Sequence, residues 1–361
     1  MTITTRKAAF GGLAALGVTA LLAGCASAPE EGDSGAAATS DFLPCMVSDA
    51  GGFDDKSFNE LGYTGLVEAS EELGVEPVDV TSESETDYAP NLTSLVDQGC
   101  NLIITVGFAL ADATKAAAEA NTDIDFAIID DASIDLENVK PITFDTSQSA
   151  FLAGYAAASY SKTGVVGTFG GQPYPTVTIF MDGYADGVAY YNEQKGTDVK
   201  VVGWDVASQN GSFTGGFAAG VEAKSAAQSL IDQNADVILP VGGPIFQSAI
   251  EAIRDSGKEI AMVGVDADLY ETYPDGSDLY LTSILKGIKE GTSDVTASAG
   301  AGEFDATPYV GTLENDGVGI APFHDFESKV SPDLQGELDA ITEGIIDGSI
   351  TVESPSAPAA S

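Results

Sequence analysis

From residue 42 onward, short apolar runs alternate with longer segments in which apolar residues recur every three or four positions. The short runs have the length of buried β-strands, and the longer segments have the period of amphipathic helices. A regular alternation of strand and helix indicates parallel β-sheets with helices on both faces. The pattern predicts about ten strands, more than one sheet comfortably holds, so we expect two sheets in two lobes.

The individual elements follow from the same pattern. The expected strands cover residues 43–48, 77–81, 102–107, 126–130, 141–144, 162–169, 200–206, 237–241, 261–265 and 280–283. The expected helices cover residues 57–73, 91–98, 111–120, 147–160, 179–194, 219–233 and 244–256.

The division into lobes follows from where the pattern restarts. A new helix begins near Ser149, after a set of strands and helices that closes one lobe. The closing segment, residues 286–321, is too short to complete the second lobe alone, so we expect the chain to cross between lobes more than once. The fold class is therefore α/β, with two doubly wound parallel sheets joined by hinge crossovers around a closing cleft. We assign residues 42–145 plus 284–312 to lobe I, and residues 146–283 plus 313–352 to lobe II.

The first 25 residues have the pattern of an export signal. Arg6 and Lys7 form a positive start, and residues 8–22 are apolar but short for a membrane span. The tetrapeptide LAGC at residues 22–25 resembles the bacterial lipobox, in which Cys25 is acylated and becomes the mature N-terminus. A plain signal peptide or an uncleaved anchor is the alternative.

The two ends of the mature chain have the composition of disordered segments. Residues 26–41 are small, polar and acidic, so we expect a flexible tether between a lipid on Cys25 and the folded body. Residues 353–361 are rich in Pro, Ala and Ser, and we expect a disordered tail.

The chain is strongly acidic, with 14 basic and 56 acidic residues. Arg6 and Lys7 are the only charged residues before Cys25. Removing them leaves 12 basic residues against all 56 acidic ones, a net charge of −44. Such a body repels polyanions, so nucleic acid is excluded as a partner.

Two cysteines remain after Cys25. Cys45 lies in the first expected strand and Cys100 lies at the third. In the doubly wound order 2-1-3-4-5 these strands are neighbours, and a pair of cysteines in an oxidising exterior favours a disulfide bond. Two buried free thiols remain the alternative. The pair has no spacing typical of a metal site.

Ligands in doubly wound folds bind beyond the carboxyl ends of the strands. The first strand is followed by residues 49–59, which read DAGGFDDKSFN. The glycines permit a tight loop that can approach a ligand closely. Phe58 and Asn59 open the next helix, where a ring can stack on a flat ligand and an amide can hydrogen-bond its edge. A place in the hydrophobic core is the other interpretation of Phe58.

This segment resembles the opening signature of the basic membrane protein family, the purine-nucleoside-binding lipoproteins of ABC importers. The resemblance continues in order along the chain and covers roughly residues 42–325. The further matching segments are 105–114, 126–130, 235–244, 263–266 and 281–286. It implies a periplasmic-binding-protein type I fold and a monomer that needs no cofactor and no metal. It also implies capture of a purine nucleoside, such as inosine, guanosine or adenosine, for an ABC permease, with the protein lipid-anchored on the outer face of the cell membrane.

The resemblance further implies how the base is held. The base would lie between two aromatic rings, which map to Phe58 and to Phe217, the latter preferred over Phe213. Asp130 maps to the acid that reads the purine edge, with Asp131 as the competitor. Carboxylates suit this role because a nucleoside presents N–H and hydroxyl donors.

The sugar would be held by a second group of residues. Asp266 and Lys286 map to the ribose-binding pair. Asp49 and Asn59 complete the lobe I side, and Gly243 lies in the glycine-rich turn where backbone approaches the sugar. Lys286 is also one of few basic residues in the chain and falls at a strand end by the expected hinge.

The sequence departs from the family at two places. Phe217 is followed by Ala218 and Ala219, where an aspartate is common in the family. Phe246 stands where a third glycine is more usual, which would remove a close approach of backbone to the sugar and tighten the pocket. These changes bear mainly on the choice of base.

The sequence gives little support to catalysis. It has one histidine, His324, which we interpret as structural, and it has no nucleophile elbow, no phosphate loop and no zinc spacing. The adjacent acids Asp54 and Asp55 could serve as general acid and base, but sequence neighbours usually point apart. We therefore expect no catalytic residue. The alternatives are a binding protein or receptor of the same fold for a sugar or another small molecule, and a nucleoside-hydrolysing enzyme.

Overall fold

The computed structural model describes residues 41–358. The expected signal peptide with Cys25 lies outside the described residues, as do the tether up to residue 40 and residues 359–361. Within the described part of the chain, no helix combines the length and the apolar character that crossing a membrane requires.

The first six-stranded sheet has the order β2-β1-β3-β4-β5-β13, and its neighbouring strands are parallel. The strands are β1 (Pro44–Val47), β2 (Val78–Val80), β3 (Leu102–Val106), β4 (Asp125–Ile129), β5 (Val139–Phe144) and β13 (Tyr309–Gly311). The first five have the doubly wound order expected from the sequence. This sheet forms the centre of lobe I.

The second six-stranded sheet repeats this order as β7-β6-β10-β11-β12-β14 and forms the centre of lobe II. Its strands are β6 (Val165–Gly170), β7 (Lys200–Val202), β10 (Val237–Val241), β11 (Ala261–Asp266), β12 (Tyr280–Lys286) and β14 (Val318–Ile320). Only β14 runs antiparallel to its neighbour. The expected strand at residues 200–206 breaks at Gly203, which has a φ of 91°, and continues into a small hairpin of β8 (Trp204–Asp205) and β9 (Asn210–Gly211).

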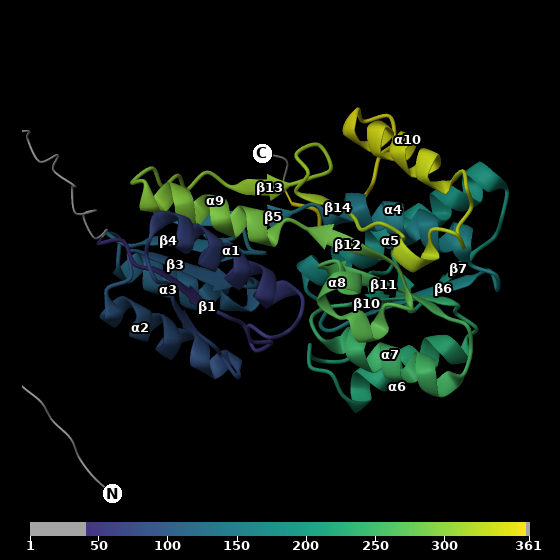
Figure 1. Ribbon diagram of the computed structural model, residues 1–361, viewed down its shortest axis with the longest axis horizontal. Coiled ribbons are helices and arrows are strands. Elements are labelled where there is room, and N and C mark those ends of the chain that lie inside the picture. The colour runs from purple at the N-terminus through teal and green to yellow at the C-terminus, as the bar shows by residue number, and fades with distance from the viewer. Residues whose placement is uncertain (1–40, 359–361) are drawn as a thin grey trace, which may run out of the picture. The chain divides into compact units, whose positions relative to one another are not determined.

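Helices cover both faces of each sheet (Figure 1). In lobe I, α1 (Phe58–Leu73) packs with α9 (Ile288–Gly300) on one face, and α2 (Tyr88–Gln98) packs with α3 (Ala111–Ala120) on the other. In lobe II the two pairs are α4 (Thr146–Tyr160) with α5 (Pro175–Lys195), and α6 (Val221–Asp232) with α7 (Ile245–Ser256). The remaining helices are α10 (Leu334–Ile346) and the short α8 (Leu269–Thr272), η1 (Glu85–Asp87), η2 (Phe108–Leu110), η3 (Pro274–Gly276) and η4 (His324–Phe326).

Helix α5 is held against α4 at glycines. A Cβ atom on Gly154 of α4 would lie 2.0 Å from the carbonyl oxygen of Tyr184, and one on Gly187 of α5 would lie 2.0 Å from that of Phe151. The two backbones therefore touch, and α4 is buried along most of its length. This packing matters for the site because the start of α5 faces the cleft between the lobes.

The segments that connect the lobes run side by side. They follow β5 at Asp145, follow β12 at Gly287, and join β13 to β14. Asp145 N donates to the Gly311 carbonyl oxygen at 2.8 Å, and Gly287 N donates to that of Gly317 at 2.8 Å. These hydrogen bonds hold the crossings together in one ribbon, which is the arrangement typical of a hinge between two lobes.

Two details differ from the expected domain boundaries. β12 ends at Lys286, so residues 284–286 belong to the second sheet, whereas the sequence pattern assigned them to lobe I. The described part of the C-terminal tail, residues 353–358, is bound to α5, whereas we expected disorder. Ser354 Oγ donates to Asp182 Oδ2 at 2.6 Å, and the hydroxyl of Ser356 lies 2.8 Å from that of Thr178.

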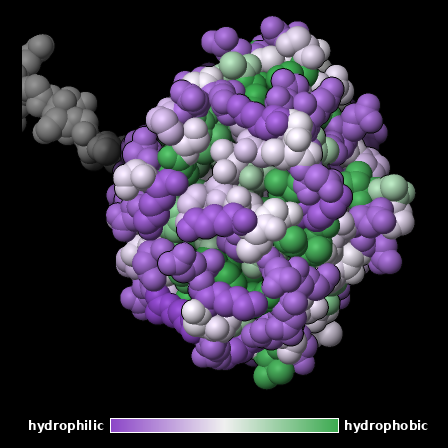
Figure 2. Space-filling model, turned by 90° about the vertical axis from the view of Figure 1, so that its right-hand side faces the viewer, coloured by the Kyte–Doolittle hydropathy of each residue, from purple (hydrophilic) through white to green (hydrophobic). Residues whose placement is uncertain are grey.

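The surface carries the acidic charge. Most basic side chains with an ion pair are partly or well exposed, as in the pairs of Lys162 with Glu259 and Lys200 with Asp198. Isolated surface pairs of this kind contribute little to stability. Figure 2 shows that the outer face of lobe II is mainly hydrophilic, with apolar residues scattered over it.

The disulfide bond between Cys45 and Cys100 is formed in the structure. The residues lie in and just before the neighbouring strands β1 and β3, with their Cα atoms 6.0 Å apart. The bond closes a loop across a sequence separation of 55 residues. Restricting the unfolded chain over that length stabilises the fold by about 4 kcal/mol.

We therefore predict that the double variant Cys45→Ser/Cys100→Ser has a free energy of unfolding lower by about 4 kcal/mol. Guanidinium unfolding with and without a reductant measures the effect. The reductant should shift the wild-type midpoint to that of the variant and leave the variant unchanged. A wild-type midpoint that is insensitive to reduction would contradict the stabilising role.

Candidate ligand-binding site

A cavity of about 630 Å³, including the space open to solvent, lies between the lobes at the carboxyl ends of their strands. Each residue that the sequence assigned to a ligand site lines it, namely Asp49, Phe58, Asn59, Asp130, Phe217, Gly243, Asp266 and Lys286. The structure thus brings together residues that are up to 237 positions apart, at Asp49 and Lys286.

The start of α1 carries a network that orients Asp49. Asn59 Nδ2 donates to Asp49 Oδ1 at 2.8 Å and to Asp55 Oδ2 at 2.9 Å. Asn59 Oδ1 accepts a bond from Asp49 N at 3.1 Å. Both donors of the Asn59 amide are therefore used within the protein, and Asn59 acts as a positioning residue for Asp49. Among the described residues, none donates to Asp49 Oδ2, which remains available in the cavity.

Asp55 also lines the cavity but has a structural role. Its carboxylate accepts bonds from the backbone N–H groups of Ser57, Asn59 and Glu60 at 2.9–3.1 Å. These are donors that the first turn of a helix leaves without intrahelical partners. Asp55 thus caps α1 and fixes the orientation from which Phe58 enters the cavity.

Two acids end equivalent strands of the two sheets. Asp130 follows β4 in lobe I, and Asp266 ends β11 in lobe II. Both have left-handed backbone conformations, with φ of 69° and 67°. Aspartate tolerates this conformation better than most residues, and such strain is concentrated at functional sites. Ser57 Oγ donates to Asp266 Oδ2 at 3.2 Å, which links lobe I to the second acid.

Lys286 lies between these two acids at the end of β12. Its Nζ is 2.5 Å from Asp130 Oδ2 and 4.0 Å from Asp266 Oδ1. The ammonium also faces three aromatic rings, with its Nζ 4.9 Å from the centroid of Phe58, 5.4 Å from that of Phe144 and 5.7 Å from that of Phe180. The side chain is only 3% exposed, so its charge is balanced by the carboxylates and the ring faces rather than by water.

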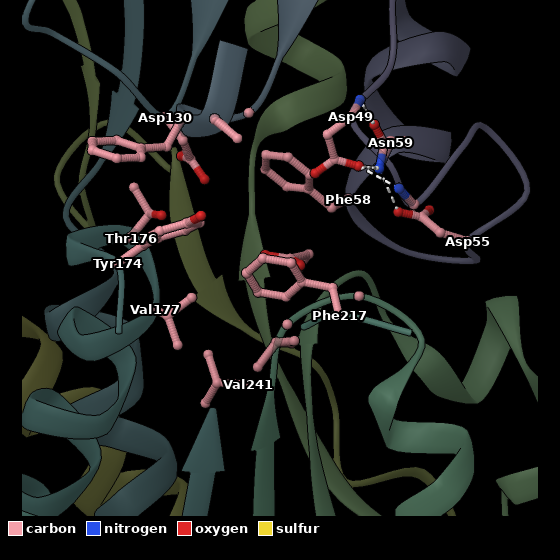
Figure 3. Close-up of a pocket in the computed structure, with 18 of the residues that line it drawn as sticks. Asp49, Asp55, Phe58, Asn59, Asp130, Tyr174, Thr176, Val177, Phe217 and Val241 are labelled. Atoms are coloured by element: carbon pink, nitrogen blue, oxygen red, sulfur yellow. Dashed lines mark hydrogen bonds between the residues drawn. The ribbon is translucent and has the colours of Figure 1, made fainter. Parts of the chain in front are cut away.

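Aromatic rings from both lobes face the cavity (Figure 3). Phe58 comes from lobe I, and Phe217 lies opposite it on a loop of lobe II. Phe217 fits against glycines, since a Cβ atom on Gly171 would lie 2.3 Å from its ring and one on Gly242 would lie 2.6 Å from it. Both rings line the same cavity.

A side wall of the cavity was missed by sequence reasoning. Phe108 and Tyr174 form a ring pair with centroids 5.3 Å apart, and Tyr174 lies 6.0 Å from Phe217. The start of α5 adds Thr176, Val177 and Phe180. Phe108 directly follows β3 and its Gly107, so its position after a strand was a usable signal. The start of α5 gave no comparable signal.

Burial makes the acids of the cavity hard to ionise. It raises the pKa of Asp49 to about 6, although the hydrogen bonds from Gly51 and Asn59 oppose the rise. It also raises the pKa of Asp266 to about 6, against the opposing charge of Lys286. Burial raises the pKa of Asp130 as well, again opposed by Lys286. A ligand that donates hydrogen bonds would favour the ionised forms.

Similarity to known proteins gives the family. Residues 42–354 match the family described as "ABC transporter substrate-binding protein PnrA-like". The chain is 31% identical over 358 residues to the "ABC transporter nucleoside-binding protein BmpA" of Lactococcus lactis subsp. cremoris, covering 94% of this chain and 97% of that protein. It is 31% identical over 310 residues to basic membrane protein A of Borreliella burgdorferi, covering 84% and 86% of the two chains.

This chain belongs to the PnrA-like family of ABC transporter substrate-binding proteins. Among solved structures, it resembles an ABC transporter solute-binding protein of Aeropyrum pernix K1, with a TM-score of 0.78 and 23% identity over 87% of this chain and 94% of that one. That likeness supports the periplasmic-binding-protein type of fold. Members of this class bind solutes outside the cytoplasm and are not classed as enzymes.

Several residues that the sequence had suggested as relevant to the site lie away from the cavity of this substrate-binding protein. Phe246 is buried in the core of lobe II, with its ring 5.2 Å from that of Tyr273, so its side chain does not narrow the cavity. Phe213 packs against Trp204, with ring centroids 6.0 Å apart. His324 pairs with Asp268 at 2.8 Å.

Asp131, the competitor of Asp130, also lies outside this cavity. Its Oδ1 accepts bonds from N and Oγ of Ser133 at 2.9 and 2.7 Å. Asp130 therefore lines the cavity together with Phe58 and Lys286, whereas Asp131 does not line it.

The raised pKa values predict how the stability of the ligand-free protein depends on pH. Because Asp49 and Asp266 have pKa values near 6 in the fold and near 3.8 when exposed, protonation favours the folded state. We expect the free energy of unfolding to rise as the pH falls from 7 to about 4, by up to about 3 kcal/mol for each group. Urea unfolding across this range measures it.

The variants Asp49→Asn and Asp266→Asn should each lose part of this pH dependence. Asp198→Asn is the matched control, because its side chain is 82% exposed and its ion pair with Lys200 is a surface pair that contributes little to stability. If both cavity variants followed the wild-type slope, the raised pKa values would be wrong.

Proposed function

We propose that this substrate-binding protein captures a purine nucleoside between its lobes and delivers it to an ABC permease. The observation that carries the proposal is the pair of rings, Phe58 and Phe217, which belong to opposite lobes and line the same cavity. A flat heterocycle between them would stack on both faces. Stacking of one base on an aromatic side chain contributes about 1–3 kcal/mol.

The polar groups of the cavity fit the rest of a nucleoside. Asp130 supplies an acceptor for the N–H donors of a purine edge, and Asp266 and Asp49 supply acceptors for ribose hydroxyls. Lys286 supplies a donor, and Gly243, with a φ of 46°, lets the backbone approach the sugar. The acids disfavour a phosphorylated ligand, so the proposal is a neutral nucleoside rather than a nucleotide.

The proposed mechanism is closure about the hinge. The open lobes admit the nucleoside, and closure brings the two rings together on the base and excludes water from the acids. The closed form then docks on the permease. The lipobox at residues 22–25 supports attachment of the protein to the outer face of the membrane through a lipid on Cys25.

Isothermal titration calorimetry with inosine, guanosine, adenosine, cytidine and ribose tests the proposal. We expect the purine nucleosides to bind most tightly and ribose alone to bind weakly. Phe58→Ala and Phe217→Ala should each weaken purine nucleoside binding by about 5-fold to 150-fold, the equivalent of one lost stacking contact. Phe213→Ala is the control, because its ring packs on Trp204 outside the cavity.

A protein that bound ribose as tightly as inosine would instead be a sugar-binding protein of the same fold. Unchanged nucleoside affinity in both aromatic variants would rule out the proposed base site. Release of free base during long incubation would indicate hydrolysis rather than transport.

A further inference from the structure

A second cavity adjoins the ligand cavity on the side of Asp130. We call it the annex, and its volume is about 560 Å³, including the space open to solvent. The two cavities share Phe108, Asp130, Thr176 and Lys286, so these side chains lie between them and the cavities adjoin there. An unsubstituted base held between Phe58 and Phe217 would leave the annex empty, because neither ring borders it.

The annex has mainly apolar walls. Asp131 and Thr143 contribute polar groups to the lining, and the apolar side chains are those of Phe144, Pro175, Ile179, Pro358 and the exposed Ala132. These side chains suit a hydrocarbon group, which gains free energy when it leaves water.

One wall of the annex comes from the C-terminal segment, which carries Ser356 and Pro358. The hydrogen bonds of Ser354 and Ser356 to α5 hold this segment in place. The wall is therefore built by specific contacts.

The annex also carries an unused polar group. The hydroxyl oxygen of Thr146 is buried and has no hydrogen-bond partner among the described residues. Thr146 lines the annex at the first turn of α4. A buried hydroxyl without a partner is costly, so a hydroxylated substituent would gain a partner here that a plain hydrocarbon group does not supply.

Asp130 lies at the junction of the two cavities. Its Oδ2 accepts a bond from Lys286, and no described residue donates to its Oδ1. If Asp130 reads the purine edge, as the proposed function holds, a group attached to that edge points toward the annex. A secondary amine on the edge keeps one N–H for Asp130 Oδ1 and places its substituent beyond the carboxylate.

We propose that the annex is a subsite for a substituent on the purine edge, and that the protein takes N6-alkylated adenosines. This inference rests on the proposed binding of purine nucleosides. The N6–H donates to Asp130, and the alkyl group fills the space between Phe144, Ile179 and Pro175. Adenosine itself uses only the ligand cavity.

Calorimetry with adenosine, N6-methyladenosine, N6-isopentenyladenosine and N6,N6-dimethyladenosine tests the subsite in the wild-type protein. We expect the two monoalkyl compounds to bind more tightly than adenosine, by up to about fourfold for each buried methylene or methyl group. The dimethyl compound should bind more weakly than N6-methyladenosine, because it has no N–H for Asp130.

A variant that fills the annex tests its location. Ala132→Phe should weaken N6-isopentenyladenosine binding by about tenfold or more and leave adenosine affinity within about twofold. Ala132→Ser is the matched control, since it keeps the space free, and both affinities should remain those of the wild type.

The outcomes separate this inference from the proposed function. If adenosine and inosine bind but the monoalkyl compounds bind more weakly than adenosine, the subsite is wrong and nucleoside binding stands. The same holds if Ala132→Phe weakens adenosine and N6-isopentenyladenosine equally. If no purine nucleoside binds, both proposals fail.

Discussion

The structure depends on one buried cation, whose charge is balanced by carboxylates from both lobes. Lys286 belongs to the sheet of lobe II, yet its closest acid, Asp130, ends a strand of lobe I. Buried charges are tolerated only when they are paired, and removing one partner of such a pair typically costs about 3–5 kcal/mol. The next residue is Gly287, where the chain crosses to lobe I, so this ion pair lies directly at the hinge.

Around this ion pair the carboxylates outnumber the ammonium groups. One ammonium faces Asp130 and Asp266, and Asp49 lines the same cavity with its Oδ2, to which no residue in the described part of the chain donates. The cavity therefore has an excess of acceptors in a largely desolvated place. A ligand that brings donors relieves this excess, which links the electrostatics of the site to closure of the lobes.

The duplicated sheet explains why the acids occur in pairs. β4 and β11 hold the same place in the two strand orders, and each is followed or ended by an aspartate with a left-handed backbone. Placing the carboxyl ends of both sheets against one cleft brings these acids within reach of the same ligand. The two aromatic rings come from different kinds of element. Phe58 lies at the start of a helix, and Phe217 lies on a loop flanked by glycines.

The sequence by itself determined the fold class, the order of the first five strands of lobe I and part of the residues that line the cavity. Strand and helix periods are local properties, and ligands in doubly wound sheets bind at strand ends, which is where the resemblance to the family placed Asp130 and Asp266. Only the tertiary structure decided what each side chain does. Asn59 donates both of its amide hydrogen bonds to Asp49 and Asp55, and Phe246 packs in the core. Tyr174 lines the cavity, and the C-terminal segment binds α5. These outcomes depend on partners far away in the chain, and no local pattern encodes the contacts that segments make once they pack.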